Sequence, residues 1–206
     1  MITVYLASNN PGKIGELLAL AGGDRLPLVL RSAREVGGMP AVEEDAGTFE
    51  GNARIKALAL RPLVPPGSGV LSDDSGLCVD ALGGRPGVES AYFAGRPGNP
   101  AANLALLAGL MKEVPLSERS AHFTCVLVFI DPKGKEFSFE GRCDGTILSA
   151  PQGSGGFGYD PLFAPQGLQE SFASLSKREK NSLSARGTAW REFVSWMQTT
   201  YANQTS

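Results

Sequence analysis

Two consecutive aspartates, Asp73 and Asp74, lie in the segment LSDDSG (71–76), just after an apolar run. Like charges placed side by side repel each other, so either one carboxylate has a partner or the two point to opposite faces of a strand end. Mg²⁺ prefers oxygen ligands and is usually held by one or two carboxylates together with substrate phosphates. We therefore expect one carboxylate of this pair and one from the acidic segment EED (43–45) to share a divalent ion. The neighbouring aspartate would then be unpaired and could orient or deprotonate water.

The segment SNNPGK (8–13) could bind phosphate. A loop between a strand and the N-terminus of a helix presents unpaired N–H groups, and the helix dipole favours an anion there. Lys13 would add a full positive charge. The segment is not a Walker A loop, because Ala7 and Ile14 stand where that motif needs Gly and Ser or Thr. A turn with a helix-capping Asn remains the alternative.

The glycine-rich stretch GSGGFGYD (153–160) could accept a flat ligand. Glycines let a loop approach such a ligand closely, Phe157 or Tyr159 can stack on a base, and Asp160 can accept hydrogen bonds. A plain glycine-rich turn is the alternative here.

Basic residues gather in SKREKNSLSARG (176–187), which contains Lys180 and Arg186, and Lys56 lies in the helix predicted after Thr48. Such residues usually form a solvated helix face, and the EED acids that precede the Thr48 helix are usually partners of its dipole. Lysine and arginine are also what phosphates and keto oxygens need.

Composition excludes several classes of protein. The single histidine, His122, lies in a β-like run, so Ser/His/Asp, Cys/His and HExxH chemistry are all disfavoured. A net charge of −2 gives no global field for nucleic acid or an anionic membrane. The three cysteines lack zinc spacing, and no signal peptide or run of 18 apolar residues appears. We expect a cytoplasmic protein that binds neither nucleic acid nor membrane.

These residues require strands and helices that position them. The predicted strands are 2–7, 26–32, two pieces on either side of the acidic pair, and a hairpin around the turn DPKG (131–134). The predicted helices begin after SNNPGK, after the cap Thr48, at 99–114 with Asn99 as cap, after a Ser176/Glu179 capping box, and within TAWREFVSWMQTTY (188–201). We expect one α/β domain over 1–206, with a mixed twisted sheet flanked by helices and two lobes around a central cleft.

Five segments in this order resemble the inosine triphosphate pyrophosphatase family: SNNPGK, TFEGNARIKA, DDSGLCVDALGGRPG, GGFGYDPLF and EKNSLSARG. The resemblance runs from Ala7 to Arg186. It implies a two-lobed α/β fold, a homodimer, Mg²⁺ dependence, and hydrolysis of non-standard purine nucleoside triphosphates (ITP, dITP, XTP) to the monophosphate and pyrophosphate.

The resemblance also implies roles for particular residues. Glu44 and Asp74 match the family's metal ligands, and Asp74 also matches its proton acceptor. Ser75 matches a substrate contact and Lys56 a lysine that faces the phosphates. The residues that match the phosphate loop are Ser8, Asn9, Asn10, Pro11, Gly12 and Lys13. Those that match the remaining substrate contacts are Phe157, Gly158, Tyr159, Asp160, Lys180, Ala185 and Arg186.

This chain departs from the family pattern at two places. Ala185 stands where the family usually has His, so one contact to the base is missing. Gly51 precedes Asn52 where the family tends to have Glu, and the acid lies one position earlier, at Glu50. Base selectivity and support for the metal must therefore come from other residues here.

The predicted reaction is in-line attack of water on the α-phosphorus, with Asp74 as base. Arg186 offers only donors, which match a 6-keto oxygen and not adenine's amino group. Two alternatives stay open: a related pyrophosphatase for other modified or pyrimidine nucleotides, and a non-catalytic nucleotide-binding module. A nucleic-acid-binding protein is disfavoured by the charge.

Overall fold

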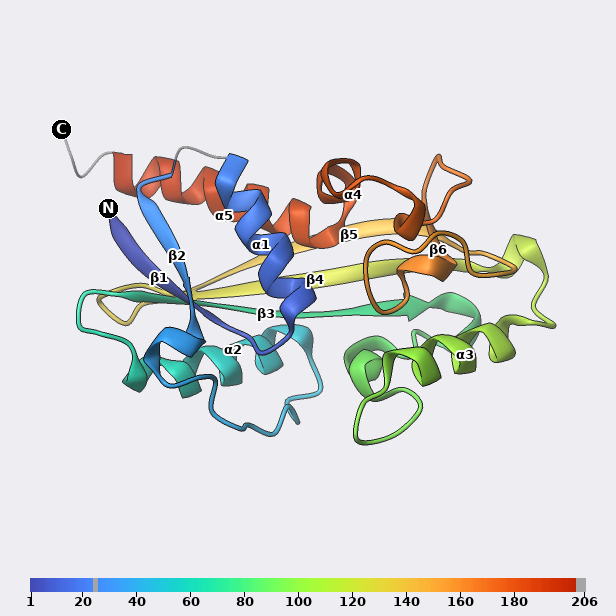
Figure 1. Ribbon diagram of the computed structural model, residues 1–206, viewed down its shortest axis with the longest axis horizontal. Coiled ribbons are helices and arrows are strands. Elements are labelled where there is room, and N and C mark those ends of the chain that lie inside the picture. The colour runs from blue at the N-terminus through green and yellow to red at the C-terminus, as the bar shows by residue number, and fades with distance from the viewer. Residues whose placement is uncertain (24–25, 203–206) are drawn as a thin grey trace. The chain divides into compact units, whose positions relative to one another are not determined.

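The computed structural model describes residues 1–23 and 26–202 and contains a six-stranded mixed sheet (Figure 1). Strand order is β2-β1-β3-β4-β5-β6. β1 pairs in parallel with β2 and β3, whereas β5 and β6 are antiparallel. The strands are β1 (Ile2–Ala7), β2 (Leu28–Ser32), β3 (Gly69–Val79), β4 (Ser120–Ile130), β5 (Glu136–Ile147) and β6 (Phe163–Pro165). The predicted α/β class with a mixed sheet is confirmed.

Three helices begin where their capping residues predict, whereas the last helix begins at Ala185, ahead of the predicted segment 188–201. Thr48 Oγ1 accepts from Gly51 N at 3.0 Å, and Asn99 Oδ1 accepts from Ala102 N at 3.1 Å. Ser176 and Glu179 form the predicted reciprocal capping box. Each cap satisfies an amide that the first helical turn leaves unpaired. The helices are α1 (Pro11–Gly23), α2 (Phe49–Leu60), α3 (Pro100–Met111), α4 (Lys177–Leu183) and α5 (Ala185–Ala202).

The acidic pair is placed differently from the prediction. β3 is one continuous strand of 11 residues, not two pieces, and Asp73 and Asp74 lie in its middle and not at a strand end. Every residue from Gly69 to Asp74 is buried, which is typical of a strand that is covered on both faces. The two carboxylates are therefore buried and need partners.

The predicted hairpin is confirmed. Gly134 N donates to Asp131 O at 2.9 Å and closes the turn between β4 and β5. Asp131 Oδ1 also accepts from Lys133 N at 2.8 Å, which is a typical use of Asp at the first position of a turn.

The chain divides into two compact units. The first contains 1–74, 125–141 and the chain from Arg186 on, and the second contains 75–124 and 142–185. The two predicted lobes correspond to these units, and β3, β4 and β5 each contribute residues to both. The central cleft stays a prediction.

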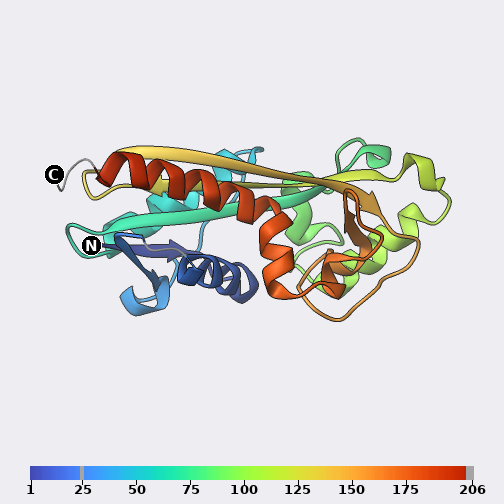
Figure 2. The ribbon, with the colours of Figure 1, turned by 90° about the horizontal axis from the view of Figure 1, so that it is seen from above.

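The first unit is built in layers. In Figure 1, α1 and α5 cover one face of its part of the sheet and α2 covers the other. Phe193 of α5 packs edge-on against Phe129 of β4 at 5.3 Å between ring centroids, and Trp196 packs against Phe137 of β5 at 4.3 Å. α5 accordingly runs along β4 and β5 (Figure 2).

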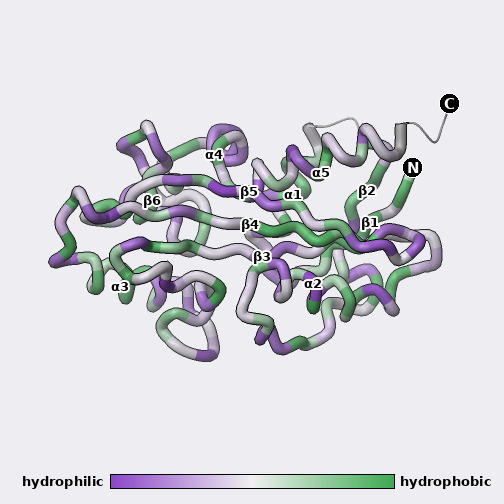
Figure 3. Tube along the Cα trace, turned by 180° about the vertical axis from the view of Figure 1, so that it is seen from behind, coloured by the Kyte–Doolittle hydropathy of each residue, from purple (hydrophilic) through white to green (hydrophobic). Residues whose placement is uncertain are grey.

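Within the first unit, β4 is the most apolar of the long strands (Figure 3). Its residues from Cys125 to Ile130 are all buried, and Val126, Val128 and Ile130 join the core beneath α2.

The second unit has an aromatic core of its own. Phe123 of β4 packs edge-on against Phe163 of β6 at 4.8 Å, and Phe172 packs against Phe163 at 5.1 Å.

Among the helices in the described ranges, not one combines the length and the hydropathy required to cross a membrane.

Candidate active site

The loop SNNPGK connects β1 to α1 and is held by its own side chains. Ser8 Oγ accepts from Asn10 N at 3.1 Å, and Asn10 Oδ1 accepts from Gly12 N at 2.9 Å and Lys13 N at 3.2 Å. The capping Asn predicted as an alternative is thus present. Asn9 and Pro11 are exposed beside it. Because Asn10 already uses two amides of the first turn, a phosphate here would rely strongly on the Lys13 side chain.

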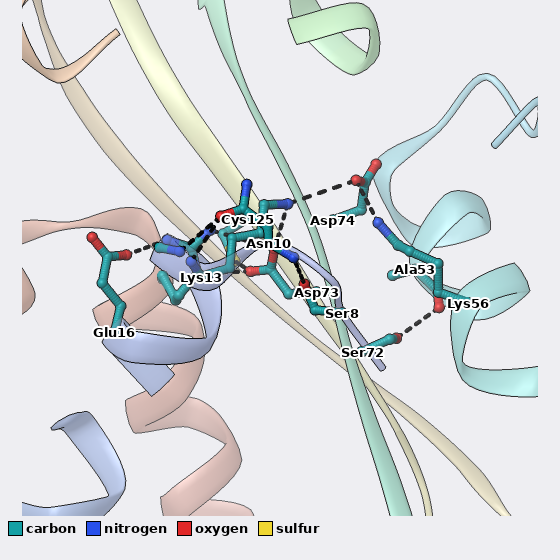
Figure 4. A network of polar contacts seen from close by, with 12 residues as sticks. Ser8, Asn10, Lys13, Glu16, Ala53, Lys56, Ser72, Asp73, Asp74 and Cys125 are labelled. Carbon is teal, nitrogen blue, oxygen red and sulfur yellow. Dashed lines mark hydrogen bonds and ion pairs between the residues drawn. The ribbon is translucent and has the colours of Figure 1, made fainter. Parts of the chain in front are cut away.

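Asp73 gathers three partners from elements distant in the sequence (Figure 4). Lys13 Nζ of α1 lies 2.6 Å from Oδ1, Arg186 Nε of α5 lies 2.8 Å from Oδ2, and Cys125 Sγ of β4 donates to Oδ2 at 2.9 Å. Burial alone would raise the pKa of Asp73, but Arg186 and Lys13 together hold it far below its usual value. The expectation that the aspartate beside the metal ligand is unpaired is therefore wrong, because Asp73 is a fully paired buried anion.

Asp74 meets a different set of groups, on the side of β3 that faces α2. Lys56 Nζ lies 2.9 Å from Asp74 Oδ1 and 2.8 Å from Glu44 Oε2, while Lys13 Nζ is 4.0 Å from Asp74 Oδ1. The pKa of Asp74 is raised, chiefly by burial. Lys13 and Lys56 lower this pKa, and the neighbouring Glu44 raises it, so burial and Glu44 together outweigh the two lysines. Burial lowers the pKa of Lys56, but Asp74 and Glu44 outweigh burial, so its pKa is raised. Glu44 and Asp74 thus converge on one ammonium group.

One buried oxygen in this group lacks a partner. Among the residues that the structure describes, Asp74 Oδ2 has no hydrogen-bond partner. A buried, unpaired carboxylate oxygen is costly, so it marks a place for a water molecule or a cation.

Asn52 positions the loop that carries Glu44. Its Oδ1 accepts from Ala46 N at 3.1 Å, and the side chain is buried in the second turn of α2. Gly51 packs against the same loop, because a Cβ there would lie 2.5 Å from Ala46 Cβ. A side chain at position 51 would therefore push this loop away in the present arrangement.

Arg186 is bound by two acids of the first unit. Besides Asp73, Glu16 of α1 forms an ion pair with its Nη1. The side chain is buried, and although burial lowers the pKa of Arg186, Asp73 and the other neighbouring anionic groups raise it well above its usual value. The role of Arg186 as a contact to the base stays a prediction, and this guanidinium would have to release part of these bonds to fulfil it.

The side chains described so far form what we call the lysine–carboxylate cluster. Its members are Lys13, Glu16, Glu44, Lys56, Asp73, Asp74 and Arg186. Glu16 and Cys125 have no sequence signal of their own, because Glu16 looks like an ordinary residue of an amphipathic helix and Cys125 like a core residue.

A second group of predicted residues lies in the second unit. Lys180 of α4 forms an ion pair with Asp160 and lies over the ring of Phe157, with Nζ 4.7 Å from the centroid. Asp160 Oδ2 also accepts from Phe157 N at 2.7 Å. Gly156 adopts φ +67°, and a Cβ there would lie 2.1 Å from Asp160 Oδ2, so this position requires glycine. We call Phe157, Tyr159, Asp160 and Lys180 the aromatic cluster.

The two aromatic residues of this cluster have different surroundings. Tyr159 is buried, its hydroxyl donates to Ser90 O at 2.8 Å, and burial raises its pKa. Phe157 and Gly158 keep part of their surface exposed. Of the two rings offered for stacking, Phe157 is therefore the one with an accessible surface.

The remaining predicted residues flank these groups. Ser75 follows Asp74 in β3 and is partly exposed. Ala185 is the first residue of α5 and is buried.

The lysine–carboxylate cluster fits a magnesium ion. No set of three or more His, Cys, Asp or Glu side chains is arranged around a metal position within 1–23 and 26–202. Mg²⁺ does not require such a cage, because it is commonly held by one or two carboxylates, with water and phosphate completing its shell. Glu44 and Asp74 could supply that donor set, and the unpartnered Asp74 Oδ2 is an available oxygen.

The chain is thus an α/β protein with a cluster of paired lysines and carboxylates in its first unit and an aromatic cluster in its second. The sequence model of the Ham1 family matches residues 4–196, and the chain belongs to this family. A relative from Opitutus terrae named dITP/XTP pyrophosphatase is 50% identical over 197 residues, which cover 94% of this chain and 97% of the relative. The family predicted from the five segments is confirmed.

Solved structures agree with this membership. A HAM1 protein from Coxiella burnetii has a TM-score of 0.84 at 32% identity, covering 97% of this chain and 100% of its own. A nucleoside-triphosphatase / dITP/XTP pyrophosphatase from Mycobacterium abscessus has a TM-score of 0.73 at 38% identity. The match covers 94% of this chain and 99% of the Mycobacterium abscessus chain.

Proposed function

We propose that this protein hydrolyses non-standard purine nucleoside triphosphates, such as ITP, dITP and XTP, to the nucleoside monophosphate and pyrophosphate. The name of the Opitutus terrae relative supports this activity. The structural observation that carries the proposal is the pairing of Glu44 and Asp74 with one Lys56 ammonium beside a buried, unpartnered carboxylate oxygen. Hydrolysis of a phosphoanhydride needs such a combination of base, anion-binding cation and metal-binding acids.

In the proposed reaction, Asp74 activates the attacking water. The Asp74 carboxylate accepts a proton from this water, which attacks the α-phosphorus in line with the departing pyrophosphate. Burial raises the pKa of Asp74, and a general base works best when its pKa lies nearer to the working pH. Lys13 and Lys56 turn from their carboxylates to phosphate oxygens and neutralise the charge that grows on the leaving group.

Mg²⁺ belongs to the proposal as the cofactor, with Glu44 and Asp74 as its protein ligands. When bound, it would polarise the phosphoryl oxygens and offset their charge. The lysine–carboxylate cluster contains four carboxylates and three cations, so its charges alone do not favour a triphosphate. A bound divalent ion would add the positive charge that a triphosphate requires.

The aromatic cluster is assigned to the purine base. Phe157 would stack on the ring, and Lys180 would donate to a keto oxygen. Adenine presents an amino group at that position, so donor would face donor, and a buried mismatch of this kind is strongly rejected. Ala185 leaves this recognition without the histidine of the family pattern. The family resemblance also assigns Arg186 to the substrate.

A homodimer in the cytoplasm completes the proposal and rests on the family resemblance. Light scattering coupled to size-exclusion chromatography tests the assembly, with a mass of two chains expected. A monomer at micromolar concentration would remove this part.

The experiment that tests the activity measures pyrophosphate released from ITP, XTP, GTP, ATP and CTP, with and without Mg²⁺. We expect Mg²⁺-dependent release that is fastest with ITP and XTP. Equal rates with ATP would remove the selectivity, and preference for CTP would indicate a pyrophosphatase of different specificity. Nucleotide binding without pyrophosphate release would identify a non-catalytic module. Glu44→Gln should lose activity. Glu43 is the exposed neighbour of Glu44, and Glu43→Gln should leave the activity unchanged.

A further inference from the structure

Lys56 lies where a divalent ion held by Glu44 and Asp74 would carry its charge. Its Nζ is 2.8 Å from Glu44 Oε2 and 2.9 Å from Asp74 Oδ1, and the side chain is largely buried between them. We infer that Lys56 is an internal counter-ion that keeps the divalent metal weakly bound until the nucleotide's phosphates draw its ammonium away. This inference rests on the proposed function, because it assumes that the site accepts a metal and a triphosphate.

The competition follows from geometry and charge. One carboxylate oxygen of each acid already accepts from the ammonium, and both acids belong to the donor set that the metal needs. An ammonium and a divalent ion a few ångströms apart repel each other strongly at the effective dielectric of a protein, about 20. The two cations therefore cannot both be held tightly by this pair of acids.

The surrounding structure keeps Lys56 in this position. Asn52, one turn earlier on α2, binds the backbone of the loop that carries Glu44. The helix that bears the lysine and the loop that bears the acid are thus fixed to each other. Figure 4 shows Lys56 pointing from α2 toward Asp74 on β3. The lysine side chain, by contrast, has a flexible stem of four carbons, so its ammonium can move while the backbone stays still.

A bound triphosphate changes the balance. Its oxygens offer the ammonium a stronger set of acceptors, and the two acids then become free for the metal. Metal and nucleotide should consequently bind with positive coupling, and by linkage each tightens the other by the same factor. Lys13 is not equivalent to Lys56, because its closest acid is Asp73 and it lies 4.0 Å from Asp74.

Binding of Mn²⁺ to the nucleotide-free protein, followed by electron paramagnetic resonance, tests this inference without turnover. Mn²⁺ prefers the same oxygen ligands as Mg²⁺. We expect Lys56→Met to bind Mn²⁺ at least about tenfold more tightly than wild type, a change of about 1.4 kcal/mol. Lys56→Arg, which keeps the charge, should stay weak, and Lys13→Met should change the affinity far less than Lys56→Met.

Two results would overturn the inference: unchanged Mn²⁺ affinity in Lys56→Met, or an equal gain in Lys13→Met, which would indicate a general charge effect. If Lys56→Met does not fold, a measurement on the wild-type protein tests the inference instead. Its Mn²⁺ affinity should rise when a non-hydrolysable α,β-methylene triphosphate is added, and equal affinity with and without the nucleotide contradicts the inference. Failure of the proposed function would appear separately, as an absence of pyrophosphate release.

Discussion

Asp73 and Asp74 are consecutive in β3, yet their carboxylates have different closest partners. Asp73 binds Arg186, Lys13 and Cys125, whereas Asp74 binds Lys56 most closely and has Lys13 at 4.0 Å. Their pKa values shift in opposite directions, downward for Asp73 and upward for Asp74. Alternation along a strand thus separates an aspartate whose charge is held by buried partners from one whose pKa is raised.

Asp74→Asn should remove most of the activity and leave the fold intact. Loss of a general base typically costs about 10² to 10⁴ in rate, and this variant also weakens a metal ligand. Pyrophosphate release from ITP and thermal unfolding measure the two effects. Asp45→Asn, on an exposed acid near Glu44, is the control and should be unchanged. Activity close to wild type in Asp74→Asn would assign the base to another group.

Asp73→Asn should destabilise the fold. Removal of one partner from a buried ion pair costs about 3–5 kcal/mol, because the remaining charge stays buried. Urea unfolding measures the loss. Asp144→Asn breaks the exposed pair with Arg142 and should cost less than about 1 kcal/mol. Equal losses in the two variants would show that Asp73 does not hold its partners as described.

Stability should also depend on Asp73 in acid. Burial opposes the charge of Asp73, but Arg186 and Lys13 lower its pKa well below the value of about 3.9 expected in the unfolded chain. As the pH falls below that unfolded value, the unfolded chain takes up a proton that the folded chain does not. The free energy of unfolding then falls by about 1.4 kcal/mol per pH unit from this group. Urea unfolding between about pH 5 and 2 should show a shallower slope in Asp73→Asn than in wild type, and identical slopes would contradict the shift.

Cys125→Ala should lower stability by about 1–3 kcal/mol, because Asp73 Oδ2 loses a donor in a buried site. Cys125→Ser retains a donor and should recover part of the loss. Cys143→Ala is the matched control, since that thiol is buried but has only a contact at 3.8 Å to Asp144 O. If Ala and Ser at position 125 behave alike in urea unfolding, the cysteine acts by packing alone.

Local features of the fold could be predicted from the sequence because their causes are local. Thr48, Asn99 and Ser176 each bond to an amide three residues away, and the turn at Asp131 closes within four residues. Spacing along the chain is sufficient to find such contacts.

The placement of the acidic pair could not be predicted in the same way. Asp73 can be buried in mid-strand because Arg186, 113 residues away, and Cys125, 52 residues away, satisfy it. Two adjacent acids normally indicate a strand end, and nothing in the local sequence shows that distant partners are available. For the same reason the sequence does not show the bonds of Arg186 to Asp73 and Glu16, which form only in the folded chain. Its contact to the base stays a prediction.

The central claim is that Asp74 and the two lysines act on the bond between the α- and β-phosphates. Hydrolysis of ITP in H₂¹⁸O, with mass spectrometry of both products, tests this claim most directly. Attack on the α-phosphorus predicts that the label enters the nucleoside monophosphate and that pyrophosphate stays unlabelled. Label in pyrophosphate or in free phosphate would contradict the account.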